Sequence, residues 1–261
     1  MKDILYSQDG PVATVTFNRP EARNALTWEM YAGLEKACET VDTDPTVKVL
    51  VLRGAGGHAF VSGTDINQFR AFRTREDAVN YENKLEQLIS RLECVKKPVI
   101  ALIQGYAVGA GAALALVSDL RYCTPDSQIG FPIARTLGNC LTVAIHSRIV
   151  DAIGPARTKE LMYRAKLVSA RQAKELGLVN DIFDPPVIDN EVGQIASEIS
   201  THAPITLQVT KEAVRRLQLH RRNIGNDMLG EDLIAQAYTS ADFREGVTAF
   251  LSKRKPTFRG K

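Results

Sequence analysis

The sequence predicts an α/β fold followed by a helical C-terminal region. Segments typical of strands and helices alternate up to the break at Asp184-Pro185-Pro186, and from residue 187 onward the apolar spacing is helical. The chain has 261 residues, of which 44% are hydrophobic and 24% charged, as in ordinary globular proteins. We therefore expect a core over residues 1–190 that carries the functional site and a helical region over residues 191–261.

The N-terminal elements are predicted to be a β-hairpin and a helix. Asp9-Gly10 lies between two segments of alternating apolar residues within 3–17, which is a hairpin pattern. Residues 27–41 have apolar side chains at helical spacing, and Thr27 begins the segment.

Two continuous apolar runs, 47–52 and 98–103, predict buried strands. Residues 74–92 between them predict an amphipathic helix with one apolar face formed by Tyr81, Leu85, Leu88, Ile89 and Leu92. Short strands are expected at 119–122, 128–131 and 178–183, and helices at 153–163 and 169–176.

The charge and apolar patterns argue against nucleic-acid and membrane partners. Lys and Arg number 33 against 30 Asp and Glu, and the basic clusters at 211–222 and 253–255 are short. We expect the first cluster to be a solvated helix face and the second a solvated tail; a binding site for a phosphorylated ligand is the alternative. No apolar run reaches about 20 residues, because glycines and Gln104 interrupt 98–118. The polar start, MKDILYSQDG, has no signal-peptide pattern, so we expect a cytoplasmic protein.

The four cysteines do not form a metal or redox motif. Cys38, Cys94, Cys123 and Cys140 are widely spaced, without a CxxC pair. We expect reduced, buried thiols and no bound metal.

Two glycine turns are the candidate chemical motifs. Ser62-Gly63-Thr64-Asp65 follows the first buried run, and Gly109-Ala110-Gly111 follows the second. A glycine turn that opens a helix leaves backbone N–H groups free to bind an anion or a developing oxyanion. Neither turn matches a phosphate loop or a dinucleotide fingerprint. For each turn alone, a tight strand-to-helix connection is the alternative.

Motifs along nearly the whole chain resemble those of the crotonase (enoyl-CoA hydratase/isomerase) superfamily. In order they are NRPEARNAL (18–26), FVSGTDI (60–66), KPVIA (97–101), GYAVGAG (105–111), SDLRY (118–122), SARQA (169–173), GLV (177–179) and FREGVTAFLSKR (243–254). The resemblance implies a spiral of ββα repeats with a C-terminal helical trimerisation region. It also implies a homotrimer or homohexamer.

The resemblance further implies an acyl-CoA thioester as substrate, with coenzyme A present only as part of it and no separate cofactor. By motif position, the N–H groups of Thr64 and Ala110 would form an oxyanion hole for the thioester oxygen. The residues that would line the CoA and acyl groups are Arg23, Ala25, Gly63, Asp65, Ile66, Asn67, Gly109, Ile133, Phe250 and Lys253.

The sequence departs from the family at the two positions where hydratases carry glutamates. These positions are Ala113 and Ile133, and neither side chain can transfer a proton. A replacement group is expected in the loop and helix over 133–146, where Arg135 and His146 are the candidates and Thr136 and Asn139 are further polar residues. Arg135 could instead be a surface charge, or it could bind a carboxylate on the acyl group. For His146, the alternative is ordinary packing in a helix. His58 is expected in a solvated loop.

The resemblance therefore implies an enoyl-CoA hydratase/isomerase-like enzyme that stabilises a thioester enolate, while the two replacements argue against simple hydration. Two alternatives stay open. One is a non-hydratase member, such as an isomerase, decarboxylase or C–C hydrolase, with its acid–base group in 133–146. The other is an acyl-CoA-binding protein without catalytic activity.

Overall fold

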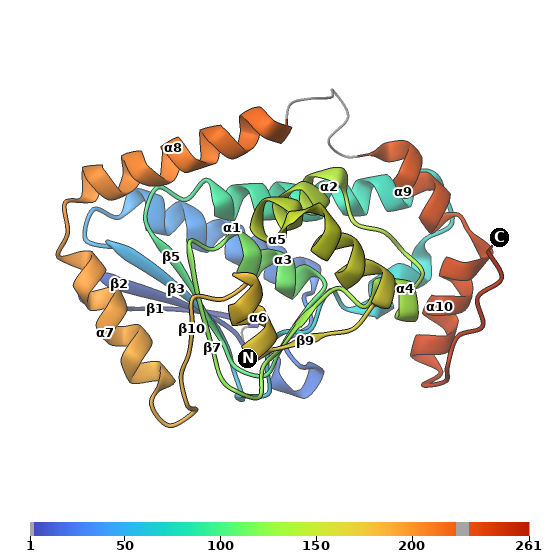
Figure 1. The fold of residues 1–261 in the computed structure, drawn as a ribbon, viewed down its shortest axis with the longest axis horizontal. Coiled ribbons are helices and arrows are strands. Elements are labelled where there is room, and N and C mark those ends of the chain that lie inside the picture. Colours follow the sequence, from blue (N-terminus) through green and yellow to red (C-terminus); the bar gives the residue numbers. More distant parts are fainter. Residues whose placement is uncertain (1–2, 223–229, 261) are drawn as a thin grey trace.

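The computed structural model describes residues 3–222 and 230–260, which form two sheets surrounded by helices (Figure 1). The strands are β1 (Ile4–Asp9), β2 (Val12–Phe17), β3 (Val49–Gly54), β4 (Ala59–Val61), β5 (Val99–Ile103), β6 (Tyr106–Val108), β7 (Leu120–Cys123), β8 (Gln128–Gly130), β9 (Val168–Ser169) and β10 (Asp181–Ile182). The α-helices are α1 (Trp28–Thr43), α2 (Arg75–Glu93), α3 (Ala110–Val117), α4 (Ile133–Thr136), α5 (Val143–Arg164), α6 (Ala170–Leu176), α7 (Ile188–Ser200), α8 (Pro204–Arg222), α9 (Glu231–Tyr238) and α10 (Ala241–Leu251). Two 3-10 helices, η1 (Pro20–Ala22) and η2 (Ile66–Ala71), complete the set.

The larger sheet has the strand order β1-β2-β3-β5-β7-β10. β1 and β2 form the predicted antiparallel hairpin, and the other neighbours are parallel. Side chains on β3 alternate between two apolar clusters, because successive residues of a strand point to opposite faces. Leu50 and Leu52 belong to the main core, whereas Val49 and Val51 pack with Ile188 of α7. Both faces are thus covered, which explains the uninterrupted apolar runs in the sequence.

The smaller sheet has the order β4-β6-β8-β9, in which β4, β6 and β8 are parallel. Each strand of this set follows a strand of the larger sheet: β4 follows β3, β6 follows β5, and β8 follows β7. A helical segment comes next each time. The chain therefore winds as repeated ββα turns, and the predicted fold class is confirmed.

Three sequence predictions need correction. The glycine turns do not follow β3 and β5 directly, because β4 and β6, of three residues each, intervene and are too short to show a period. The helix predicted at 153–163 corresponds to the second half of α5; the first half, from Val143, was not predicted, and Gly154 with φ +76° interrupts the helical conformation between the two halves. Finally, Cys94 is exposed and Cys140 is only partly buried, whereas Cys38 and Cys123 are buried as expected.

The C-terminal region is helical as predicted. α7 packs against the larger sheet, and residue 190 lies within this helix. α8 extends along one side of the molecule, and α9 and α10 lie at the end where the chain terminates (Figure 1). Within residues 3–222 and 230–260, no helix combines the length and apolar character needed to cross a bilayer.

Candidate active site

The two glycine turns come together because they follow neighbouring strands. Thr64 lies just beyond β4, Ala110 begins α3 directly after β6, and Ile133 begins α4 after β8. These three strands are adjacent and parallel in the smaller sheet, so their carboxyl ends meet at one edge. Neighbouring strands lie about 4.8 Å apart. Positions that are 69 residues apart in the sequence thus share one edge.

Glycine is needed where the turns approach each other. Gly63 and Gly109 have φ of +104° and +56°, which side chains rarely permit. A Cβ on Gly109 would lie 3.8 Å from Cα of Gly63, so the two turns lie close together. A Cβ on Gly111 would lie 2.0 Å from the carbonyl oxygen of Val61, so α3 can approach β4 only with glycine there.

The turns leave two backbone donors unused. Leu26 N–H donates to the Gly63 carbonyl at 2.8 Å, and Asp65 N–H donates to the Leu26 carbonyl at 2.9 Å. Thr64 N–H, which lies between these bonds, has no acceptor within the described residues. Ala110 N–H is at the first position of α3, where the helix provides no acceptor either. Two such donors on neighbouring turns can bind one negatively charged oxygen.

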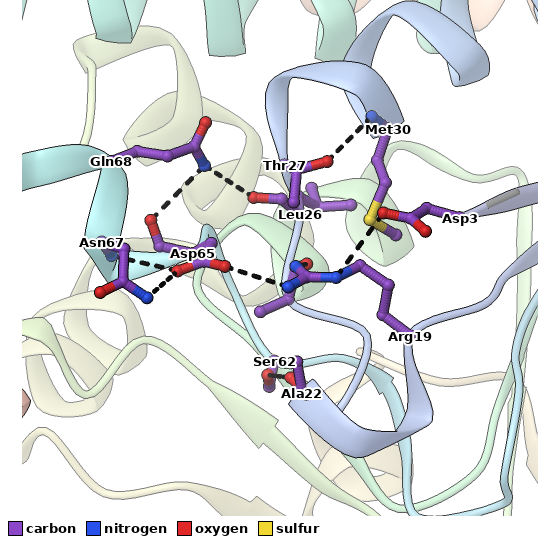
Figure 2. A network of polar contacts seen from close by, with 11 residues as sticks. Asp3, Arg19, Ala22, Leu26, Thr27, Met30, Ser62, Asp65, Asn67 and Gln68 are labelled. Atoms are coloured by element: carbon purple, nitrogen blue, oxygen red, sulfur yellow. Dashed lines mark hydrogen bonds and ion pairs between the residues drawn. The ribbon is translucent and has the colours of Figure 1, made fainter. Parts of the chain in front are cut away.

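A polar network holds the first turn in place (Figure 2). Arg19 donates to Asp65 at 3.2 Å and to the Ala25 carbonyl at 2.7 Å. Asp65 caps η2 by accepting the N–H of Asn67 at 3.0 Å. Gln68 donates to the carbonyl of Leu26 at 2.9 Å. The network connects the segment around Arg19 to the residues on both sides of Thr64.

The charge of Asp65 is stabilised within this network. Burial opposes ionisation of the carboxyl, but hydrogen bonds from Asn67 and Arg19 outweigh it and hold the pKa of Asp65 below its ordinary value. Asp65 is therefore a permanent anion that fixes the turn, and it is not poised to exchange protons near neutral pH.

The side chain of Thr64 faces a group of phenols. Its hydroxyl lies 2.9 Å from the hydroxyl of Tyr31 on α1 and 2.9 Å from that of Tyr81 on α2. Burial raises the pKa of both tyrosines above the ordinary value, so both remain protonated. Aromatic rings surround these phenols in a cluster of Trp28, Tyr31, Phe69, Phe72, Tyr81, Tyr238 and Phe243.

The two positions aligned with the hydratase glutamates are apolar and enclosed. Ala113, on the first turn of α3, has 2% of its surface exposed, and Ile133, at the start of α4, has 8%. Neither position offers a proton-transferring group. In the described part of the chain, no cluster of three or more His, Cys, Asp or Glu side chains could hold a metal ion.

The acid–base residues predicted from the sequence lie on α4 and α5. Arg135 is exposed on α4. His146 is half-buried on α5, and its Nδ1 lies 2.9 Å from the Thr142 carbonyl of the preceding turn. His58 is exposed in the turn before β4, as expected. The structure shows no contact between either predicted catalytic side chain and Thr64 or Ala110.

The predicted CoA-binding residues fall into two groups. Arg23, Ala25, Asp65, Ile66 and Asn67 lie together around the first turn, where Ser62 N–H donates to the Arg23 carbonyl at 3.1 Å. The guanidinium of Arg23 lies 5.4 Å from the centre of the Tyr106 ring. Phe250 and Lys253 are at the end of α10, and both are exposed.

Three residues around the first turn and α2 make contacts that sequence reasoning missed. Arg19 was part of a recognised motif, but its pairing with Asp65 across 46 positions was not predictable. Glu82 lies beside the predicted apolar face of α2 and is buried because α9 covers it. Tyr238 is on α9, where the sequence predicted only a helical segment.

Comparisons with known proteins identify the family of this chain. The family model described as enoyl-CoA hydratase/isomerase matches residues 7–261. The chain is 31% identical to 2,3-dehydroadipyl-CoA hydratase of Escherichia coli (strain K12) and 32% identical to 1,2-epoxyphenylacetyl-CoA isomerase of the same strain, with 100% of each chain covered in both cases.

A solved structure of methylmalonyl-CoA decarboxylase, in complex with 2-nitronate-propionyl-CoA, superposes with a TM-score of 0.90 at 26% identity. It covers 99% of this chain and 98% of its own. The relatives thus include a hydratase, an isomerase and a decarboxylase, and what they share is the fold and the family. By sequence and by structure, this chain belongs to the enoyl-CoA hydratase/isomerase family.

Proposed function

We propose that the protein binds an acyl-CoA thioester and stabilises its enolate, with the thioester oxygen held by the N–H groups of Thr64 and Ala110. The observation that carries the proposal is the close approach of the two glycine turns, each of which has a backbone donor without an acceptor within the described residues. Preorganised donors of this kind bind an oxyanion more strongly than a neutral carbonyl, and each contributes on the order of 3 kcal/mol to the transition state.

The CoA moiety would lie along the segment around the first turn. Arg23 and Tyr106 support this placement, because an exposed cation stacked on a ring can contact a phosphate or a purine. Lys253 would contribute a second charge from the end of α10. The names of the relatives, which include three CoA thioesters, favour the same substrate class.

The chemistry is proposed to differ from simple hydration. A hydratase must orient and deprotonate water and also protonate the α-carbon, and each positioned acid–base group contributes about 10²–10⁴-fold. Ala113 and Ile133 supply neither function. We therefore expect an enolate-forming reaction, such as isomerisation or decarboxylation, and only slow turnover of crotonyl-CoA. Transfer of the α-proton of a saturated acyl-CoA to deuterated water tests this directly, because a passive binder would bind the ester without exchange.

The proposed donors can be tested by a change in the main chain. Ala110→Pro removes the N–H at the first position of α3, where proline is well tolerated in helices. The α-proton exchange of butyryl-CoA, followed by mass spectrometry, should fall by about 10²–10³-fold. Ala110→Gly is the control, because it keeps the N–H, and its exchange rate should stay within about tenfold of the wild type. Equal rates for the proline and glycine variants would exclude this donor.

A further inference from the structure

A buried carboxyl lies between α2, α9 and the loop that follows α4. Glu82 of α2 has 1% of its surface exposed, and one of its oxygens accepts a hydrogen bond from the Tyr238 hydroxyl of α9. Its other oxygen, Oε2, has no partner within the described residues. Asn139, in the loop, donates to the same Tyr238 hydroxyl at 3.2 Å, and its buried Oδ1 also lacks a partner there.

Glu82 differs from the acidic residues further along the same helix. Glu86 and Glu93 pair with Arg148 of α5 at 2.7 and 2.8 Å, whereas no described Lys or Arg pairs with Glu82. An uncompensated carboxylate is unfavourable in an apolar interior. Burial raises the pKa of Glu82 to about 8, although the bond from Tyr238 opposes the increase. The carboxyl is thus mostly protonated at neutral pH and can give or take a proton close to it.

The contacts around Glu82 lead to the first glycine turn on one side and to the loop after α4 on the other. Its neighbour Tyr81 contacts the Thr64 hydroxyl, and the rings of Tyr81 and Tyr238 lie 6.2 Å apart. On the other side, Asn139 and Cys140 belong to the loop that leads away from Ile133. Burial and the charge of Glu82 together raise the pKa of Cys140 to about 12.

Oε2 of Glu82 and Oδ1 of Asn139 are buried polar atoms near one phenol, and buried polar atoms normally have partners. Glu82 is also the sequence neighbour of Tyr81, which contacts the turn that carries Thr64. We propose that Glu82 is the acid–base residue that transfers the α-proton of the acyl-CoA whose thioester oxygen is held by Thr64 and Ala110. The assignment rests on the proposed function above.

In the proposed reaction, one proton moves between the α-carbon of the acyl group and the carboxylate of Glu82. The carboxylate of Glu82 takes the α-hydrogen as a proton, and the C–H electron pair forms the C=C bond of the enolate. The thioester C=O pair moves onto oxygen, where the two N–H groups stabilise it. The carboxylic acid exchanges its proton with solvent and then returns one to the α-carbon, which restores the thioester.

Titratable groups on the elements packed around Glu82 affect its pKa. Tyr238 of α9 lowers its pKa through a hydrogen bond, and the charge of Glu86 raises it. Tyr31 and Tyr81 stay protonated in this range, as does Cys140, and Arg148 compensates Glu86. The removal of Tyr238 or Glu86 should therefore move the pH profile in opposite directions.

The test is α-proton exchange of butyryl-CoA in deuterated water, measured over a pH range. For the wild type we expect an exchange rate that rises with pH and levels off above an inflection near pH 8. Glu82→Gln keeps the shape of the side chain, should retain butyryl-CoA binding in calorimetry, and should lose about 10²–10⁴-fold in exchange. The matched control Glu86→Gln removes a carboxylate one turn further along α2; its maximal rate should stay within about threefold, with the inflection at lower pH.

Tyr238→Phe supplies a second, independent readout. Without the phenol hydrogen bond, the inflection should move to higher pH, an effect that a purely structural role for Glu82 would not produce. Exchange by Glu82→Gln within a few-fold of the wild type would overturn the assignment and leave the proposed function intact. An unchanged inflection in Tyr238→Phe would overturn it even if Glu82→Gln did not fold. Binding of butyryl-CoA without exchange in the wild type would overturn the proposed function as well.

Discussion

Individual polar residues decide how the first turn is held. Asn24 is fully buried and has φ +56°. Its amide nitrogen donates to the carbonyls of Ala55 and Ala59 at 3.0 and 2.7 Å, and its oxygen accepts the N–H of Arg19 at 2.9 Å. One side chain thus connects the segment that carries Arg23 to the loop that leads into β4.

Asn24→Ala should destabilise the protein by about 3–5 kcal/mol. The variant would leave two buried carbonyls and one N–H without partners and would place alanine in a left-handed conformation. Urea unfolding followed by circular dichroism measures the loss. Asn67→Ala is a suitable comparison, because the Asn67 side chain makes its bond at the surface and its removal should change stability by less than about 1 kcal/mol. Equal losses in the two variants would contradict this account.

Glu82 also makes stability depend on pH. Its pKa is about 8 in the folded chain and near the ordinary 4.5 in the unfolded chain, so between these values the unfolded chain binds fewer protons. Stability therefore falls as pH rises from about 4.5 to about 8, and it is fully retained only below that window. Glu82→Gln should remove this dependence and gain on the order of 2–5 kcal/mol relative to the wild type between pH 5 and pH 9. Denaturant midpoints of the wild type and of Glu82→Gln at pH 5 and pH 9 test this prediction. Stabilities of the two proteins that change in parallel with pH would contradict it.

The sequence predicted the positions of the two glycine turns better than the polar side chains buried near them. The turns that carry Thr64 and Ala110 have a local pattern, and the family motifs fix their position; the binding of a thioester oxygen by the two N–H groups stays a prediction. Glu82 could not be located, because its burial depends on α9, which follows it by some 150 positions in the chain. Helical spacing placed it beside the apolar face of α2, where a glutamate is usually solvated.

At the scale of elements, α2 and α5 are joined by an ionic contact. The side chain of Arg148 is 5% exposed and lies between Glu86 and Glu93, and it also donates to the Ser90 hydroxyl at 3.2 Å. Burial disfavours its charge, but the two carboxylates more than compensate and raise the pKa of Arg148. Arg148 is thus the cation that allows α2 to bury its acidic side.

Arg148→Met should cost about 3–5 kcal/mol, because it leaves two partly buried carboxylates unpaired. Arg164→Met is the matched control. Its pair with Glu160 is more than half exposed on both sides, so its loss should cost less than about 0.5 kcal/mol. Thermal unfolding of both variants gives the comparison. A small shift for Arg148→Met would show that solvent already screens the pair.

Element prediction succeeded where segments were long and periodic. The helices α1 and α2 and the buried strands β3 and β5 were located to within about two residues, as strong periodic signals allow. β4 and β6 were missed because three residues cannot show a period. These two short strands place the glycine turns side by side, so the arrangement of the site depended on the weakest local signals.

For the whole molecule, α8 leaves an apolar face uncovered. Ile205, Val209 and Leu217 are 68%, 61% and 64% exposed and lie on the same side of the helix. The opposite side is held by the ion pair of Lys211 with Asp119 at 2.8 Å. An exposed aliphatic face of this kind favours association with another surface.

We expect the protein to sediment as a trimer or hexamer, in line with the sequence-based prediction, and Leu217→Glu to weaken that assembly. A charge on this face would have to be desolvated in an interface. Gln208→Glu adds the same charge at an exposed polar position of α8 and serves as the control. Sedimentation velocity over a range of concentrations distinguishes the two. A monomeric wild type, or equal association of both variants, would contradict the prediction.

The close approach of Gly63 and Gly109 has a consequence for how this protein can change over generations. The proposed oxygen-binding groups are main-chain atoms, so almost any codon change at Thr64 or Ala110 leaves them present, with proline as the exception. The residues that would move protons are ordinary side chains, and each can be replaced by a single mutation. Descendants of this protein could therefore come to catalyse a different reaction and still bind the thioester oxygen through the same two N–H groups.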